Sequence, residues 1–138
     1  MTEPTGIDEP TSADQPSTDQ PRGASIEPTD AEDRKILTLA RAARARTDAA
    51  QGASVRDTDG RTYAASSVAL ASLRLSAVQV AVAMAVSSGA PGLEAVAVVG
   101  AERLAEADRA VIADLGGKSI VVWLADPAGA VEERVVLP

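Results

Sequence analysis

The chain has 138 residues and a formal net charge of −7, and it contains no histidine and no cysteine. Without thiols there is no disulfide framework, and without imidazole or thiolate ligands a zinc site of the usual kind cannot be built. The acidic balance, with no basic run and no cluster of stacking aromatics, argues against direct nucleic-acid binding.

Residues 1–30 differ in composition from the rest of the chain. Prolines recur there among Thr, Ser, Asp and Gln, and seven carboxylates stand against the single basic residue Arg22. Such a segment buries too little apolar surface to offset its ordering entropy, so we expect a disordered, acidic, Pro/Thr-rich tail. We interpret it as a solvating leader, with a partner-binding segment as the alternative. Residues 31–138 are nearly neutral and suffice for one folded domain.

The first residues lack the basic and apolar regions of a signal peptide. A cytoplasmic location is therefore the default expectation.

The folded part is expected to begin with a helix and a hairpin. Thr29 or Asp30 can cap a helix that runs to about Arg46, because carboxylates follow in its first turn and apolar residues recur at helical spacing. Two short strands, 53–56 and 61–66, then flank the polar turn 57–60, which ends in Asp-Gly and is typical of a hairpin.

The second half of the chain predicts two further helices and three extended segments. Residues 72–88 contain no Gly or Pro and are almost entirely apolar, which indicates a helix buried in the domain or at a subunit contact. Its dozen apolar residues are too few for a membrane span, which needs about twenty. The runs 94–99 and 119–124 predict strands covered on both faces, and residues 101–115 predict a helix between them. A last extended segment covers 130–137.

This order of elements predicts an α/β fold, a three-layer α/β/α sandwich with a mixed sheet.

Several short pieces of sequence stand in a recognisable order along this frame. They are Gly52-Ala53, Asp59-Gly60-Arg61, Ser76 to Gln79 leading into Ala85 to Gly89, Arg109, and Val135 to Pro138. Together with the order of elements they resemble the cytidine deaminase family over about residues 33–138. The resemblance implies the cytidine deaminase-like fold. It also implies a homo-oligomer, a dimer or tetramer, since family members assemble through surfaces that include the central helices.

Two motifs of the family fall on altered residues here. The family's Cys-Ala-Glu-Arg falls on Ser76 to Gln79, and its Pro-Cys-Gly-x-Cys-Arg falls on residues 104–109. The resemblance thereby assigns the zinc-ligand positions to Ser76, Ala105 and Asp108, and the position of the general acid/base to Val78. The chemistry of the family requires a zinc-bound water and a carboxylate that moves protons. A serine is a poor zinc ligand and a valine cannot carry a proton, so these positions provide neither. We therefore expect no metal, no cofactor and no catalytic residue.

The function expected from this comparison is that of a pseudoenzyme, a catalytically inactive cytidine deaminase-like protein that acts as a structural or protein-interaction module with an unidentified protein partner. One alternative is a non-catalytic module that binds a nucleoside or another small ligand, with a possible remnant pocket at Ser67, Gln79 and Arg109. A second alternative is a cytidine deaminase, as the fold alone would suggest.

Three side chains allow more than one interpretation. Asp108 falls on an apolar stripe, where it is either a polar group of a ligand pocket or a carboxylate paired with an arginine. The hydroxyl of Ser76 is expected to bond back to its own helix, with a nucleophile as the alternative, for which the chain offers no histidine base. Trp123 is expected to anchor the core or an interface, with a stacking platform as the alternative.

Overall fold

The computed structural model describes residues 26–138, so most of the expected tail lies outside the described residues. Residues 26–30 have no regular secondary structure and lead into the first helix. The helices are α1 (Ala31–Thr47), α2 (Ala77–Ser87) and α3 (Glu106–Leu115). The strands are β1 (Gly52–Asp57), β2 (Thr62–Ser66), β3 (Val68–Leu70), β4 (Leu73–Leu75), β5 (Leu93–Val99), β6 (Ile120–Ala125) and β7 (Val131–Leu137).

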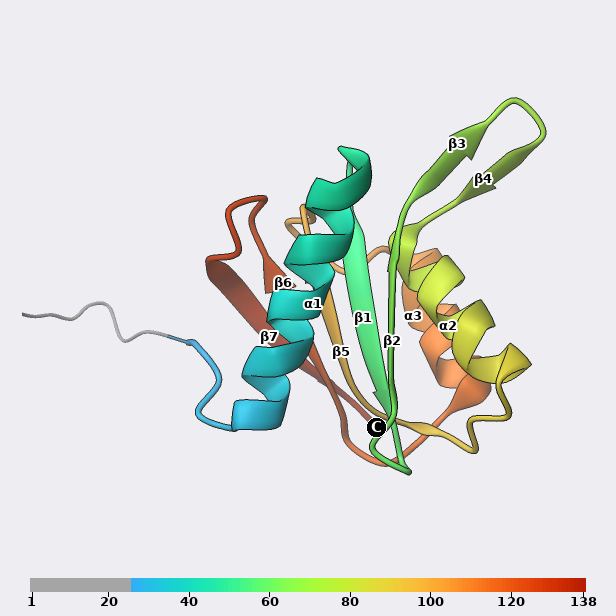
Figure 1. Ribbon diagram of the computed structural model, residues 1–138. Coiled ribbons are helices and arrows are strands. Elements are labelled where there is room, and N and C mark those ends of the chain that lie inside the picture. The colour runs from blue at the N-terminus through green and yellow to red at the C-terminus, as the bar shows by residue number, and fades with distance from the viewer. Residues whose placement is uncertain (1–25) are drawn as a thin grey trace, which may run out of the picture.

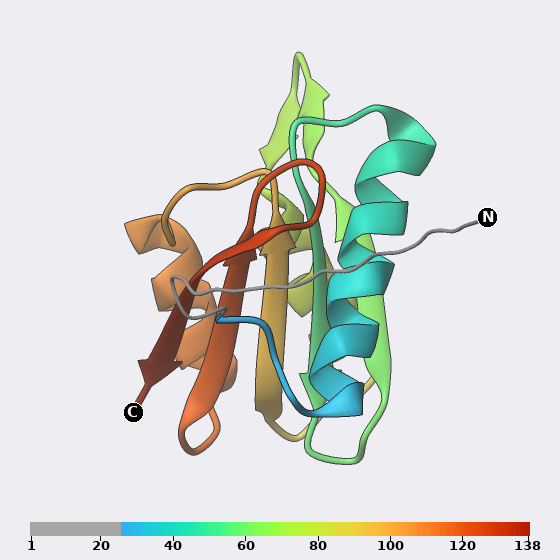
Figure 2. The same cartoon turned by 90° about the vertical axis from the view of Figure 1, so that its left-hand side faces the viewer.

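The main sheet has five strands in the order β2-β1-β5-β6-β7. Only β5 and β6 run parallel, and α3 connects them; the other neighbouring pairs are antiparallel. The helix α1 covers one face of this sheet, whereas α2 and α3 cover the other (Figures 1 and 2). The expected three-layer α/β/α fold with a mixed sheet is confirmed.

The central strand β5 shows why the sheet sequences are continuously apolar. Its residues Ala95, Ala97 and Val99 pack in the cluster under α1, whereas Val96 and Val98 pack in the cluster under α2 and α3. Successive side chains of a strand point to opposite faces, so a strand covered on both sides cannot alternate between apolar and polar residues.

The helix α1 begins at a cap that the sequence predicted and lies very close to the sheet. The side chain of Asp30 accepts a hydrogen bond from the Glu32 backbone N–H at 2.8 Å. Farther along the helix, a Cβ atom at Gly52 would collide with the carbonyl oxygen of Ala40. Glycine at position 52 therefore permits the close approach of α1 to β1.

The expected hairpin between the first two strands is confirmed, and one carboxylate organises its turn. Asp57 Oδ1 accepts hydrogen bonds from the backbone N–H groups of Asp59 and Arg61, and Asp57 Oδ2 accepts one from the Tyr63 hydroxyl. Because Asp57 is fully buried, these donors are what make its burial tolerable.

The prediction that one helix covers residues 72–88 is wrong at its beginning. Residues 68–75 form the two-stranded hairpin β3-β4, which is separate from the main sheet, and α2 begins only at Ala77. Leu73, Arg74 and Leu75 contain no helix breaker, so the absence of Gly and Pro did not reveal the boundary. The boundary is set by Ser76, whose side chain caps α2.

The helix expected at 101–115 also begins later than predicted, at Glu106. Gly100 has a φ of 95° and Ala105 has an extended backbone, and residues 101–105 connect β5 to α3 without forming a helical turn. Leu104 thus precedes α3 instead of belonging to it, although it still packs against the core.

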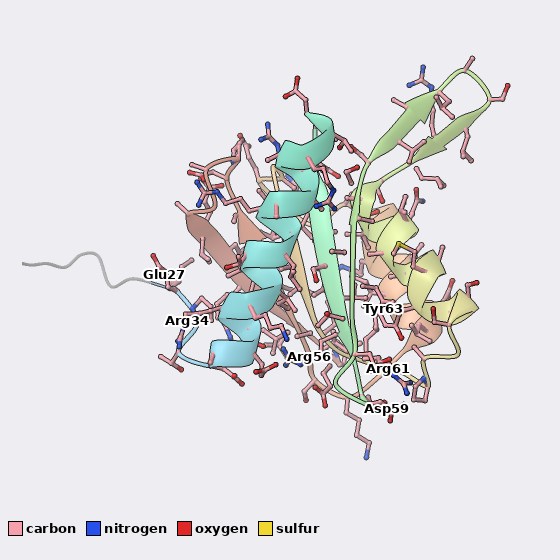
Figure 3. All side chains as sticks on the ribbon, in the orientation of Figure 1. Glu27, Arg34, Arg56, Asp59, Arg61 and Tyr63 are labelled. Atoms are coloured by element: carbon pink, nitrogen blue, oxygen red, sulfur yellow. The ribbon has the colours of Figure 1, made fainter. Side chains whose placement is uncertain are left out.

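A buried polar network fastens α1 to the sheet. Trp123 Nε1 on β6 donates a hydrogen bond to Asp33 Oδ2 on α1 at 3.1 Å, and Asp33 Oδ1 forms an ion pair with Arg56 Nη1 on β1 at 3.0 Å. Arg56 Nε also donates to Glu94 Oε1 on β5 at 2.9 Å. Figure 3 shows Arg56 near the end of the sheet at which α1 begins. Trp123 is thus a core anchor, as expected, and is only 5% exposed.

Burial alone would lower the pKa of the Arg56 guanidinium. Its contacts with Glu94 and Asp33 outweigh this desolvation, and the pKa is raised above the ordinary arginine value. Arg56 therefore remains charged inside the network and requires its carboxylate partners.

Replacing Asp33 should test how much this network contributes to stability. We expect Asp33→Ala to lower the free energy of unfolding by about 3 kcal/mol, because it leaves a nearly buried guanidinium with one partner fewer. Urea unfolding followed by the fluorescence of the single tryptophan measures this change. Glu32→Ala, in the same helix turn but exposed, is the matched control and should cost less than about 1 kcal/mol. Equal effects of the two substitutions would contradict the role given to the network.

Candidate functional site: the paired beginnings of two helices

The positions that the family resemblance singles out lie where α2 and α3 begin. Ser76 is the N-cap residue of α2, and its hydroxyl accepts a hydrogen bond from the Gln79 backbone N–H at 3.0 Å. The Gln79 side chain in turn accepts from the Ser76 backbone N–H at 2.8 Å. This reciprocal capping box satisfies two backbone donors at the beginning of the helix.

A short hydrogen bond joins the two helices at this point. Ser76 Oγ donates to Asp108 Oδ1, in the first turn of α3, at 2.6 Å. Asp108 is only 5% exposed, so its carboxylate needs such a donor. A serine hydroxyl has one proton and two lone pairs, so Ser76 can cap its own helix and donate to Asp108 at once.

The electrostatic setting favours a negative group at this place. The N-terminus of a helix carries a partial positive charge, and Asp108 lies in the first turn of α3 while it touches the N-cap of α2. The N-terminal ends of α2 and α3 both carry a partial positive charge, and these two charges repel each other. The Asp108 carboxylate interacts favourably with both and so offsets this repulsion.

The structure confirms one expectation for this pair and corrects another. The hydroxyl of Ser76 does bond to its own helix, as predicted. The predicted pairing of Asp108 with an arginine is wrong: within residues 26–138, no ion pair includes Asp108, and its partner is Ser76. Spacing along α3 alone located the buried carboxylate, but its donor comes from 32 residues away in the sequence.

The side chains at these positions do not fit a zinc ion. Ser76 and Asp108 supply one hydroxyl and one carboxylate, both already used in the hydrogen bond, and Ala105 supplies no donor. In the part of the chain that the structure describes, no group of three or more His, Cys, Asp or Glu residues could hold a metal ion. Zinc in proteins takes at least three side-chain ligands from these residue types.

The position that the resemblance assigns to the general acid/base belongs to the hydrophobic core. Val78 is completely buried in the cluster that α2 and α3 form with the sheet. Its side chain can neither accept nor donate a proton at any pH.

The three residues of the possible remnant pocket have separate surroundings. Ser67 Oγ accepts a hydrogen bond from the Gln51 backbone N–H, and the Gln79 side chain is used in the capping box. Arg109 lines a cavity of about 260 Å³ beside α3, together with Ile120 from β6 and Leu137 from β7. Neither Ser67 nor Gln79 lines that cavity.

In the described part of the chain, no helix is long and apolar enough to cross a membrane.

Comparison with known proteins places this arrangement in context. A family model described as cytidine deaminase-like matches residues 29–129. The chain is similar to the crystal structure of a cytidine deaminase from Burkholderia pseudomallei, with a TM-score of 0.66 and 26% identity over 75% of this chain and 91% of that one. A cytidine deaminase from Mycobacterium tuberculosis matches with a TM-score of 0.59 and 25% identity, covering 67% of this chain and 85% of that one. A search of curated proteins gave no significant match.

A double-mutant cycle should measure the coupling between Ser76 and Asp108. We expect Ser76→Ala to lower the free energy of unfolding by about 3 kcal/mol, because it removes the cap of α2 and leaves a buried carboxylate without its donor. The coupling to Asp108→Ala should be about 1 to 3 kcal/mol, measured by urea unfolding. Ser72→Ala in the exposed hairpin turn is the matched control and should change stability by less than about 0.5 kcal/mol. Strictly additive effects of the two substitutions would show that the bond does not join the helices.

Proposed function

The chain belongs to the cytidine deaminase-like family, and we propose that it is a catalytically inactive member, a pseudoenzyme that acts as a structural or protein-interaction module. The observation that carries this proposal is the hydrogen bond between Ser76 and Asp108, which uses the side chains at two of the positions that the resemblance assigns to metal ligands. The fold is retained while its chemistry is replaced by a helix-to-helix contact.

The chemistry of the available side chains supports the absence of deamination. Hydrolytic deamination of this kind needs a zinc-bound water, whose pKa the metal lowers from that of bulk water to about 7, and a carboxylate to move protons. The whole sequence lacks histidine and cysteine, and the carboxylate position is the buried Val78. A water molecule without these partners is a poor nucleophile at neutral pH.

The proposal includes a cytoplasmic location and assembly into a homo-oligomer. The absence of cysteine is compatible with a reducing compartment. The nearly neutral folded part is compatible with self-association, since the excess negative charge lies mostly in residues 1–30.

Metal analysis and an activity assay test the proposal together. We expect the purified chain to contain far less than one zinc per molecule, to show no loss of cytidine absorbance over hours, and to keep its melting temperature when a chelator is added. A zinc-dependent cytidine deaminase, assayed in parallel, shows that the conditions detect turnover. Stoichiometric zinc together with turnover would establish the alternative, a functional deaminase, and refute the proposal.

One observation favours a second candidate function, a non-catalytic module that binds a small ligand. Arg109 is partly buried in its cavity, and within residues 26–138 it has neither an ion pair nor a side-chain hydrogen bond. An arginine beside the apolar residues Ile120 and Leu137 suits a small molecule with an anionic group and an apolar body.

A melting-temperature panel tests this second candidate. A ligand present at about 100 times its dissociation constant should stabilise the fold by about 2.7 kcal/mol. The panel should include cytidine, uridine and their monophosphates, and any shift should be lost in Arg109→Gln. Arg103→Gln, which changes an exposed arginine outside the cavity, is the matched control. The absence of any shift across the panel would remove the nucleoside-binding alternative.

A further inference from the structure

The helix α1 carries an unbalanced charge on the side that faces away from the sheet. From residue 34 to residue 47 the helix contains five basic residues and no acidic one. Four of these basic side chains are exposed and the fifth is partly buried beside them. The surface that they form, here called the basic face of α1, consists of Arg34, Lys35, Arg41, Arg44 and Arg46.

The basic face has few carboxylates to balance it in the described part of the chain. None of the three ion pairs found within residues 26–138 includes Lys35, Arg41 or Arg46. Exposed helices commonly pair a basic residue with an acidic one three or four positions away, but Arg41 and Arg46 have no such neighbour. The partial negative charge at the end of a helix favours basic residues in the last turn, but it does not explain Lys35, which lies near the beginning.

The rest of the described chain has the opposite balance. Outside α1, residues 26–138 contain 13 acidic residues and seven basic ones. An acidic segment is therefore repelled on balance by most of the molecule and attracted by the basic face of α1.

The acidic tail joins the described chain beside this helix. Ile26, the first described residue, lines a cavity of about 420 Å³ together with Trp123 of β6 and Arg134 of β7. Trp123 packs in the cluster under α1, so the chain enters on the face of the sheet that α1 covers, as Figure 2 shows. Arg34 Nη1 then donates hydrogen bonds to the carbonyl oxygens of Pro28 at 3.3 Å and Thr29 at 2.7 Å, which hold the entering segment against α1.

The chain before Ile26 is long enough to cover the basic face. Residues 1–25 contain five carboxylates and one basic residue, Arg22. An α-helix rises about 1.5 Å per residue, so the distance along the axis from Lys35 to Arg46 is about 16 Å. An extended chain covers about 3.3 Å per residue, so 25 residues can reach about 80 Å.

We propose that residues 1–25 lie against the basic face of α1 in the same molecule, where the tail carboxylates pair with Lys35, Arg41 and Arg46. A single exposed ion pair is weak. Because the tail is covalently attached, its local concentration at α1 is roughly millimolar, and several weak pairs together are then sufficient. The inference concerns the tail and α1 alone and does not depend on whether the protein is an enzyme.

Paramagnetic broadening of amide NMR signals tests the contact on the full chain. Because the chain has no cysteine, the variant Ser12→Cys can carry a nitroxide at one defined place among the tail carboxylates. At low ionic strength we expect the amide signals of Thr38, Ala42 and Ala45, which lie between the basic side chains, to lose most of their intensity. At about 1 M salt the Debye length falls to about 3 Å, and most of the intensity should return.

Two sets of glutamine substitutions separate the basic face from the net charge of the molecule. The first set should remove the salt-dependent broadening, and it consists of Lys35→Gln, Arg41→Gln and Arg46→Gln. The second set is the matched control, because it removes three exposed positive charges outside α1 and should leave the broadening intact. It consists of Arg74→Gln, Arg103→Gln and Lys118→Gln.

A further variant leaves residues 26–138 unchanged. It replaces each tail carboxylate by its amide, and it should remove the broadening as the first glutamine set does. A folding defect caused by substitutions in α1 then cannot account for the result. The substitutions are Glu3→Gln, Asp8→Asn, Glu9→Gln, Asp14→Asn and Asp19→Asn.

A mixed sample tests whether the tail acts within its own molecule. It combines isotope-labelled wild-type chain with unlabelled Ser12→Cys chain that carries the nitroxide, at the same total concentration. We expect no broadening of α1 in this sample. Equal broadening in the mixed sample would place the tail on another copy and overturn the inference.

Two other outcomes would overturn it as well. One is the absence of broadening in α1 at low ionic strength, and the other is broadening that neither salt nor the first glutamine set reduces. Zinc content and turnover enter none of these measurements, so failure of this inference and failure of the proposed function are distinguishable.

Discussion

The hydrogen bond between Ser76 and Asp108 is the contact on which the arrangement of the second helical layer depends. It brings together the beginnings of α2 and α3, and it puts a negative group where two partial positive charges converge. The bond therefore fixes the relative position of two helices whose remaining contacts are aliphatic and weakly directional.

The layers of the fold can be predicted from patterns that are local in the sequence. The cap at Asp30, the Asp-Gly turn between β1 and β2 and the continuously apolar β5 and β6 each have a local physical signature, and the structure confirms them. The β3-β4 hairpin could not be predicted in the same way. Leu73 to Leu75 suit either a strand or a helix, and the side chain of Ser76 decides between them through its capping bonds. The partner of Asp108 was equally hidden, because a contact over 32 residues leaves no trace in helical periodicity.

The helix α2 has two apolar sides with different consequences. Its inner side, with Val78 and Ala81, completes the core. Its outer side, with Met84 and Val86, is not needed by the core at all.

The contact between Trp123 and Asp33 has a consequence for how the molecule is made. It connects residues 90 positions apart, and Arg56 contributes from a third element, the strand β1. On the ribosome, α1 emerges long before β6. The Asp33 carboxylate therefore stays without its Trp123 partner until the last third of the polypeptide has left the exit tunnel. Contacts of such long range close slowly. The Asp33 side chain thus reaches its final environment only after β6 has been synthesised.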